Sequence, residues 1–460
     1  MVWHGAWTLQ SVLPVCAQAL HRNSSCRTDG GNPTGDGLQN GWFCQAPRTR
    51  HESQDNSMKE NYYFDNAATT LPKPEPVYEF MDQFFRSHGV NPGRSGHQLA
   101  VEAETMIVQT RRLLAEFFGF AGDPARVTFS LSATDSMNIA LLGLMQPGDH
   151  MVITRMEHNA VLRPTNHFER DRQISVTRVA ADQAGYVDPQ EIRRSIRSDT
   201  RVVVVNHASN VTGSLQDIEA IGRVVRETNA ILVLDSCQTA GVVAIPMDDW
   251  GIDVLVYTGH KGLFGPMGIG GMIVAAGVDI RPLRTGGTGV DSLSPFHPDD
   301  YPQRLEAGTL SLPGVAGLNA AQKWFADLGR ARGAGPAANH GQACRVAQEH
   351  IHAVETGFTR RLIEAFEALP DVAIYGPRNN QPRVATLSMN IGDIPAEQVG
   401  AMLDADHGVC VRPGLHCAPL VHEDRGTLER KGTVRFAPGF FTDEEDINQA
   451  IEAVRAITEY

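Results

Sequence analysis

The chain has 460 residues, of which 42% are hydrophobic and 20% charged, a composition typical of a soluble globular protein. Its formal net charge is −13 and it has no dense run of lysine or arginine, so we expect neither a nucleic acid nor an anionic membrane as its main partner. No apolar stretch approaches the roughly 18 to 20 residues that cross a bilayer. Seven cysteines without a CxxC pair predict reduced thiols in a cytoplasmic compartment, and no metal site is expected from their spacing.

Residues 1–57 differ in composition from the rest of the chain. They are rich in glycine, asparagine, serine, arginine and histidine, and they show no sustained hydrophobic periodicity. We expect a disordered extension, or residues that precede the native start. The stretch "MKENYYFDNAATT", from Met58, opens the folded part, and residues 58–75 are expected to pack with a small C-terminal domain.

Residues 76–328 alternate short apolar runs with helix-like segments and form the predicted large domain. The apolar runs are rich in β-branched residues and lie at 126–130, 150–155, 174–179, 201–207, 230–236 and 252–260. Helices are predicted between them, at 134–145, 160–170 and 217–229. Apolar strands separated by helices predict a parallel or mixed sheet that is covered on both faces.

The chain after residue 328 is predicted to form a second domain. The Gly- and Ala-rich stretch 329–342 is typical of a linker or surface loop. A long helix at about 345–368, two or three strands and a closing helix at about 443–458 come after it. This pattern predicts a small α+β domain over residues 343–460.

Polar residues follow five of the predicted strands. In open α/β sheets, ligands bind outside the carboxyl ends of the strands. The cluster "LSATDSMN" follows the first run, and "MEHNA", which contains His158, follows the second. The other polar groups at strand ends are Asn210, Asp235, Gln238, Thr258, His260 and Lys261. One polar strand end would be unremarkable, but five of them indicate a site.

The lysines narrow the chemistry of this site. The chain has five lysines, and Lys261 is the one that ends an apolar strand. It is followed by "GLFGPMGIGG", where the backbone can approach a ligand closely. A desolvated lysine loses its proton readily and forms Schiff bases with carbonyl compounds. A Schiff-base lysine on an α/β sheet indicates pyridoxal phosphate (PLP) as the cofactor.

The other needs of PLP can be met by residues at neighbouring strand ends. Asp235 is placed to pair with the pyridine nitrogen, and His158 offers a flat ring for stacking. The segment "SATDS" offers a helix N-terminus for the phosphate, with Ala133, Thr134 and Ser136. Each feature also has a structural alternative, because both Asp235 and "SATDS" can act as plain helix N-caps. No dinucleotide-binding or P-loop motif is present.

The motifs, taken in chain order, resemble those of one enzyme family. They are "YYFDNAATT", "NPGRSGH", "MEHNAVLRP", "NHASNVTGS", "DSCQTAG", "TGHKGLFGP", "RLEAGT" and "RPGLHCAPL…GTVRFAPG". This set, from about residue 62 to 458, resembles the cysteine desulfurases, with the selenocysteine lyases beside them, among enzymes of the class V aminotransferase fold. The resemblance implies PLP fold type I, with a mostly parallel seven-stranded sheet in the large domain, a smaller α+β domain and a homodimer.

The resemblance also implies roles for individual residues. Lys261 would bind PLP as a Schiff base and move protons at the substrate Cα, and Asp235 would pair with the pyridine nitrogen. Gln238 would contact the ring hydroxyl and His158 would stack on the ring. Contacts with the phosphate are implied for Thr134, Thr258 and His260, and for Thr309 from a second subunit, next to Ala133 at the predicted helix N-terminus. Contacts with the substrate are implied for Arg435, which would hold its carboxylate, and for Asn210 and Arg412.

The segment "VRPGLHCAPL" places Cys417 in a predicted exposed turn beside Arg412 and His416. A thiolate is the nucleophilic form of cysteine, and nearby cations favour it. The resemblance implies that Cys417 attacks the sulfur of L-cysteine to form a persulfide and that L-alanine is released. A glycine-bearing loop can bring the thiol to the substrate and then carry the persulfide outward to an acceptor protein. The alternative is a buried, inert cysteine. Pro413 and Cys237 depart from the family pattern, but neither removes a required group.

The function expected from these features is that of a cysteine desulfurase, which supplies sulfur for iron–sulfur clusters or thiolated cofactors. One alternative is another PLP enzyme of this fold, such as a selenocysteine lyase, a transaminase or an epimerase. A second alternative is a non-catalytic protein that binds a partner or senses a ligand. Cys417 favours the desulfurase over the first alternative, and the intact set of Lys261, Asp235, His158 and Arg435 argues against the second.

Overall fold

The computed structural model describes residues 61–93, 96–378 and 380–459, which belong to one compact unit. The predicted N-terminal extension, residues 1–57, lies outside the described residues. None of the helices in the described ranges has the length and apolar character needed to cross a membrane.

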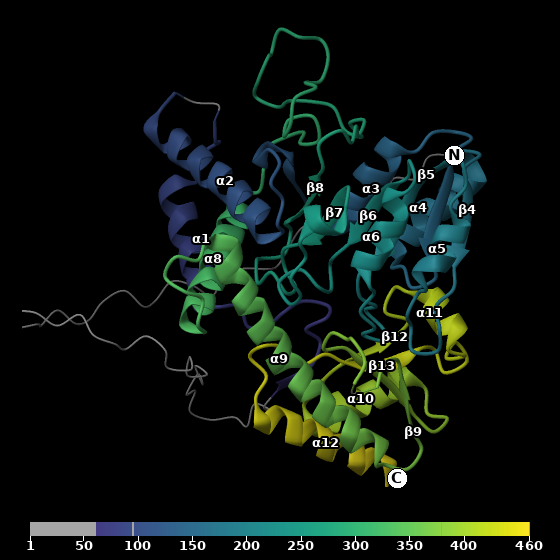
Figure 1. The fold of residues 1–460 in the computed structure, drawn as a ribbon. Coiled ribbons are helices and arrows are strands. Elements are labelled where there is room, and N and C mark those ends of the chain that lie inside the picture. The colour runs from purple at the N-terminus through teal and green to yellow at the C-terminus, as the bar shows by residue number, and fades with distance from the viewer. Residues whose placement is uncertain (1–60, 94–95, 379, 460) are drawn as a thin grey trace, which may run out of the picture. The chain divides into compact units, whose positions relative to one another are not determined.

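The centre of this unit is a seven-stranded sheet, as the resemblance implied (Figure 1). Its strands, in spatial order, are β2 (Val127–Ser130), β8 (Gly270–Val274), β7 (Val254–Thr258), β6 (Ile231–Asp235), β5 (Thr200–Asn206), β3 (His150–Thr154) and β4 (Ser175–Val179). Neighbouring strands run parallel, except that β8 is antiparallel to both β2 and β7. The predicted mostly parallel sheet is therefore confirmed.

Helices cover both faces of the sheet. Successive side chains of a strand point to opposite faces, and here both faces carry apolar side chains that must be buried. Val203 and Val205 of β5 lie in one core, while Val202 and Val204 lie in the other. The first core is shared with α1 (Glu75–His88), α2 (Gln98–Phe117), α5 (Pro189–Ser195), α6 (Ile218–Arg226), α7 (Met247–Trp250) and α8 (Leu312–Ala331). The second core is shared with α3 (Ala133–Leu144) and α4 (Asn159–Asp171), and a short 3-10 turn, η1 (Pro124–Arg126), leads into β2.

Strand β8 was not among the predicted strands, because its glycine-rich start resembles a loop. Gly270 and Gly271 open this strand, and both are fully enclosed. A Cβ added to Gly271 would lie 2.2 Å from the carbonyl oxygen of Thr128 and 2.3 Å from the hydroxyl of Tyr257. Glycine is therefore required here by close packing within the sheet, and not by a turn.

The C-terminal part of the chain contains a second, antiparallel sheet. Its strands, in spatial order, are β12 (Arg412–Gly414), β13 (Thr433–Phe436), β10 (Leu387–Ile391) and β9 (Val372–Tyr375). The helices of this part are α10 (Ala396–His407), α11 (Pro419–Asp424) and α12 (Glu444–Thr458). Beside them, β1 (Tyr62–Tyr63) pairs in parallel with β11 (Val409–Cys410), and Phe64 lies in the core of this part.

Helix α9 (His340–Glu367) links the two parts, as Figure 1 shows. Ala347 and Ile351 in its first half pack in a core of the large sheet, while Leu362 and Phe366 in its second half pack with the C-terminal sheet. One continuous helix of 28 residues therefore belongs to both cores.

The Gly- and Ala-rich stretch 329–342 is partly helical, because six of its fourteen residues belong to α8 and α9 and the other eight connect these helices. Helix α8 continues to Ala331 and α9 begins at His340, so only 332–339 connect them. A Cβ on Gly329 would lie 1.8 Å from the carbonyl oxygen of Ala343, and a Cβ on Gly341 would lie 2.4 Å from that of Glu116. These glycines permit helices to pack closely, and alanine favours helix formation.

Candidate active site

A cavity of about 210 Å³ lies where the carboxyl ends of β6 and β7 meet the N-terminus of α3 and the edge of the C-terminal sheet. Eleven of the predicted site residues line it: Ala133, Thr134, His158, Asn210, Asp235, Gln238, Thr258, His260, Lys261, Arg412 and Arg435. Two predicted residues, Thr309 and Cys417, are not among its lining residues. The structure therefore brings the residues predicted from strand ends together with Arg412 and Arg435, which the resemblance implied, around one cavity.

The N-terminus of α3 forms one wall of this cavity. Ser132 is the N-cap, and its side chain accepts a hydrogen bond from the backbone N–H of Asp135 at 3.2 Å. Ser132, Ala133 and Thr134 line the cavity. The first N–H groups of a helix lack partners within the helix and attract anions, so the "SATDS" segment is both an N-cap and a suitable phosphate site. Ser136 instead pairs with Ser130 and is buried.

His158 forms a second wall and is held by the start of α4. Its Nδ1 accepts a hydrogen bond from the backbone N–H of Ala160 at 3.0 Å, which leaves the ring proton on Nε2. Burial lowers the pKa of His158 to about 4, although the charge of Asp235 acts in the opposite direction. The imidazole is therefore neutral near pH 7 and presents a flat, uncharged ring to the cavity.

Asp235 and Gln238 lie at the end of β6. Asp235 is 5% exposed, and its Oδ1 accepts a hydrogen bond from the backbone N–H of Cys237 at 3.0 Å. It does not cap a named helix, so the N-cap alternative is not supported. Gln238 donates from Nε2 to the carbonyl oxygen of Ala67 at 3.1 Å, which ties this strand end to the "DNAATT" segment.

Lys261 follows β7 and has its pKa lowered by burial, and further by the charges of Arg435 and Arg412. Asp235 and Cys237 act in the opposite direction. The amine is therefore closer to its neutral, nucleophilic form than that of an exposed lysine.

The carbonyl oxygen of His260, next to Lys261, accepts hydrogen bonds from Lys73 Nζ at 2.5 Å and from Thr69 Oγ1 at 3.1 Å. Burial lowers the pKa of His260 to about 4 and that of Lys73 to about 8. Lys73 was excluded as a candidate because prolines flank it in the sequence. It nevertheless supports the backbone beside Lys261, through a contact that joins residues far apart in the chain.

Arg435 and Arg412 form the wall contributed by the C-terminal sheet, where they are directly opposite residues on β13 and β12. Arg435 donates to Asp65 Oδ1 at 2.6 Å and to the carbonyl oxygen of Asn210 at 3.1 Å. Burial lowers the pKa of Arg435, and Asp65 partly offsets this effect. Asp65 was quoted only as part of "YYFDNAATT" and was not named as a site residue.

Cys417 lies beside this wall, in the turn between β12 and α11. Its sulfur is 3.9 Å from Arg412 Nη2 and it is only partly buried, so it is not an inert core cysteine. His416 and Cys417 have φ angles of 48° and 59°, which are unusual for residues with side chains. Residues in such conformations persist where their surroundings hold them, and they cluster at active sites.

Hydrogen bonds with three residues from other parts of the chain hold this turn. Asn210 Nδ2 donates to the carbonyl oxygen of His416 at 2.5 Å. The backbone N–H of Asn159 donates to the carbonyl oxygen of Cys417 at 2.7 Å. His416 Nε2 also lies 3.0 Å from Thr433 Oγ1. Residues 415–418 therefore form a short turn that these bonds anchor to the large-sheet part of the chain and to β13.

Thr309 lies on the long connection between β8 and α8, which has no helix or strand and extends away from the sheet (Figure 1). This residue is exposed. Nearby Glu306 is buried in a bidentate ion pair with Arg111, at 2.7 and 2.8 Å. Thr309 is thus anchored close to the sheet yet is not part of its own chain's cavity.

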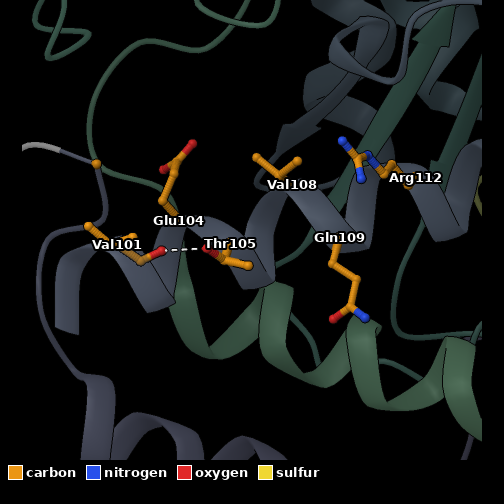
Figure 2. Close-up of a pocket in the computed structure, with 7 residues that line it drawn as sticks. Val101, Glu104, Thr105, Val108, Gln109 and Arg112 are labelled. Carbon is orange, nitrogen blue, oxygen red and sulfur yellow. Dashed lines mark hydrogen bonds between the residues drawn. The ribbon is translucent and has the colours of Figure 1, made fainter. Parts of the chain in front are cut away.

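A larger hollow, of about 540 Å³, lies along α2 (Figure 2). Val101, Glu104, Thr105, Val108, Gln109 and Arg112 line it together with Gly93. These residues include no lysine, histidine or cysteine, so the smaller cavity is the one equipped for covalent chemistry. Over the described ranges, no group of three or more histidine, cysteine or acidic side chains is arranged to hold a metal ion.

Comparisons with known proteins identify the family and the fold of this chain. Residues 62–450 match the family described as aminotransferase class-V. The chain belongs to the class-V aminotransferase family. A protein of Methanothermobacter thermautotrophicus named "probable cysteine desulfurase" is 30% identical over 416 residues, which cover 89% of this chain and 98% of that protein. A "probable cysteine desulfurase" of Pyrococcus abyssi is also 30% identical, over 85% of this chain and 92% of its own.

Solved structures support the same class-V aminotransferase fold. The apo cysteine desulfurase of Thermococcus onnurineus has a TM-score of 0.77 and 28% identity, over 87% of this chain and 95% of its own. A cysteine desulfurase of Escherichia coli has a TM-score of 0.74 at 24% identity. The predicted family and fold are therefore confirmed, and class-V aminotransferases in general use PLP.

Buried polar atoms without a hydrogen-bond partner indicate whether this cavity is suited to a polar cofactor such as PLP. Four buried atoms of lining residues have no hydrogen-bond partner: Asn210 Oδ1, His260 Nδ1, His416 Nδ1 and Arg435 Nε. Buried polar groups are costly without partners, so these atoms fit a cavity that receives polar ligands. Lys261, whose pKa is lowered, matches the carbonyl of PLP, and the carboxylate of Asp235 at a strand end matches its pyridine nitrogen. The N-terminus of α3 matches its phosphate.

Proposed function

We propose that this class-V aminotransferase is a PLP-dependent cysteine desulfurase, which removes sulfur from L-cysteine and releases L-alanine. The observation that carries this proposal is that the sulfur of Cys417 lies 3.9 Å from Arg412, a lining residue of the cavity that contains Lys261. A thiol beside a cation that can hold a substrate carboxylate is suited to accept sulfur from a bound cysteine. Relatives named cysteine desulfurase support the same activity.

The residues that would hold PLP are those that line the cavity on the side of the large sheet. Lys261 would bind it covalently, and the start of α3 would hold its phosphate with Thr258 and His260. Its ring would contact Asp235, Gln238 and His158. Bound PLP supplies an electron sink for the negative charge that develops at the substrate Cα.

The protein's own groups then bind the substrate and move its protons. Arg435 and Arg412 would hold the carboxylate, for which the planar guanidinium is well shaped, and Asn210 would assist. Once the amine of the substrate has displaced it from the cofactor, the Lys261 amine would be free, and its lowered pKa would let it take the proton from the substrate Cα near neutral pH.

Sulfur transfer would follow at Cys417. Its thiolate attacks the substrate sulfur, so that a new S–S bond forms while the substrate Cβ–S bond breaks. The electron pair of the broken bond stays with Cβ, which takes up a proton to give L-alanine. The persulfide on Cys417 is then passed to the thiol of an acceptor protein, and since the turn of Cys417 is short and anchored, the acceptor must approach this turn.

The test is to incubate the purified holoenzyme with L-cysteine and a reductant and to measure sulfide and alanine. We expect both in equal amounts, and we expect Cys417→Ala to abolish sulfide while it retains the cofactor absorbance. Cys410→Ala is the matched control, because Cys410 is also a partly buried thiol but lies on β11, paired with Tyr63, and not in the turn beside Arg412; it should keep full activity. Sulfide production that survives in Cys417→Ala would refute the role of this thiol. A strong preference for selenocysteine over cysteine would instead assign a selenocysteine lyase.

A further inference from the structure

The two arginines of the substrate wall need a counter-charge. Arg412 and Arg435 are register partners on β12 and β13, and directly opposite side chains of an antiparallel pair lie close together. Like charges in such positions repel, and the repulsion grows when one of them is removed from water. The side chain of Arg435 is only 1% exposed.

Asp65 supplies that counter-charge from behind the cavity wall. Its Oδ1 accepts a hydrogen bond from Arg435 Nη2 at 2.6 Å, yet Asp65 is not a lining residue of the cavity. Its backbone forms a bridge with Ala437, so the carboxylate is fixed to the strand that carries Arg435. Arg435 Nε has no partner and remains available to a ligand.

The charges at this end of the cavity therefore sum to about one positive charge. The two guanidinium groups belong to opposite residues of β12 and β13, and one carboxylate, that of Asp65, pairs with Arg435, while Asp235 lies at the end of β6 on the side of the large sheet. One net positive charge balances the single carboxylate of an amino acid whose side chain is neutral. A second negative charge on the ligand would lose its hydration without finding a free cation, which is costly in a buried site.

We propose that Asp65 is a specificity-determining residue, which makes the site select amino acids with a neutral side chain over those with an acidic one. This inference rests on the proposed function, because it assigns the two arginines to the substrate carboxylate. Without the charge of Asp65, the second guanidinium would be free to attract an acidic side chain.

The test compares L-aspartate with L-asparagine, which have nearly the same shape and differ by one charge. Calorimetric titration of the holoenzyme gives a Kd for each in the wild type, Asp65→Asn and Asp65→Ala. We expect the wild type to bind asparagine more tightly than aspartate. Both variants should shift the ratio of the two Kd values towards aspartate by about tenfold, since charge interactions remain strong in partly buried sites. Asp82→Asn, on exposed α1, is the matched control and should leave the ratio unchanged.

An unchanged ratio in either folded variant would overturn the proposal, as would a wild type that does not bind asparagine. In particular, an unchanged ratio in Asp65→Asn with weaker binding of both ligands to Asp65→Ala would show that Asp65 only positions Arg435. The titration needs no turnover. A wild type that discriminates as expected but releases no sulfide from L-cysteine would refute the desulfurase and not the role of Asp65.

Discussion

The backbone N–H of Asn159 donates a 2.7 Å hydrogen bond to the carbonyl oxygen of Cys417. Asn159 is the first residue of α4 and directly follows His158, whose ring faces the cavity. The bond therefore fixes the backbone of Cys417, in the C-terminal part, relative to His158 on the side of the large sheet. Because sulfur transfer requires two sulfur atoms to meet, this fixed position has consequences that can be measured.

Asn210→Ala should slow sulfur transfer more than it weakens cofactor binding. The change removes the 2.5 Å hydrogen bond from Asn210 Nδ2 to the carbonyl oxygen of His416, and with it one of the contacts that hold the Cys417 turn. We expect the rate of persulfide formation to fall about tenfold, the equivalent of one buried hydrogen bond. Rapid-quench measurement of persulfide checks this, with the visible absorbance of the cofactor as reference. An equal loss of both would contradict the prediction.

Glu355→Gln should make stability less dependent on pH. Glu355 is buried in α9, and burial raises its pKa to about 8 from an ordinary value near 4.5. The unfolded chain therefore releases this proton at lower pH than the folded chain does. The protonated carboxyl thus contributes to the free energy of unfolding in full below about pH 4.5, and this contribution is lost as the pH rises to about 8. The loss corresponds to about 1.4 kcal/mol for each unit of pKa difference.

Chemical denaturation at several pH values measures this effect. The wild-type free energy of unfolding should fall between pH 5 and 8 by a few kcal/mol more than that of Glu355→Gln. Glu349→Gln, at an exposed position on the same helix, should follow the wild type. Parallel curves for the wild type and Glu355→Gln would show that the buried carboxyl is not the cause.

Gly329→Ala and Gly357→Ala should change stability in opposite directions. Both glycines lie inside helices, where alanine is usually the more stable residue by about 1 kcal/mol. A Cβ on Gly329 would lie 1.8 Å from the carbonyl oxygen of Ala343, so Gly329→Ala must separate α8 from α9 and should destabilise by about 1 to 3 kcal/mol. Nothing lies within 4 Å of a Cβ on Gly357, so Gly357→Ala should stabilise. Thermal unfolding of the two variants is sufficient to compare them.

Thr309→Ala should weaken cofactor binding if Thr309 serves the site of a second copy of the chain. Thr309 is exposed and lies outside its own chain's cavity, so a loss of PLP affinity could not arise within one chain. We expect a several-fold increase in the Kd for PLP, measured by spectrophotometric titration of the apoprotein. Mixing Thr309→Ala with Lys261→Ala chains should then restore at most one complete site per pair. An unchanged PLP affinity in Thr309→Ala would contradict this arrangement.

The strand ends of the large sheet could be predicted because parallel strands deliver their carboxyl ends to the same edge. Asp235, Thr258 and Lys261 were found in this way without knowledge of any long-range contact. Strand β8 was missed because Gly271 is required by its neighbours, and a single sequence does not show those neighbours.

Asp65 and Lys73 were missed for a related reason. The contact of Asp65 with Arg435 spans 370 residues, and that of Lys73 with His260 spans 187. No local pattern of residues reports such a pair, because each partner is an ordinary charged residue in its own segment. The anchored turn of Cys417 was also not predictable, since the bonds that hold it come from Asn210 and Asn159, both in the large-sheet part of the chain.

The pairing of β1 with β11 sets the order in which the protein can be completed. Tyr62 and Tyr63 leave the ribosome early, but their partners Val409 and Cys410 are made almost 350 residues later. The backbone N–H of Ala437 also donates to the carbonyl oxygen of Phe64 at 2.7 Å, next to the "DNAATT" segment that contributes Ala67 to the cavity. During synthesis, the large sheet can form while this edge of the cavity is still missing. A nascent chain that has not yet reached residue 437 therefore has no finished cavity, and the wall that contains Arg412 and Arg435 is the last part of it to be made.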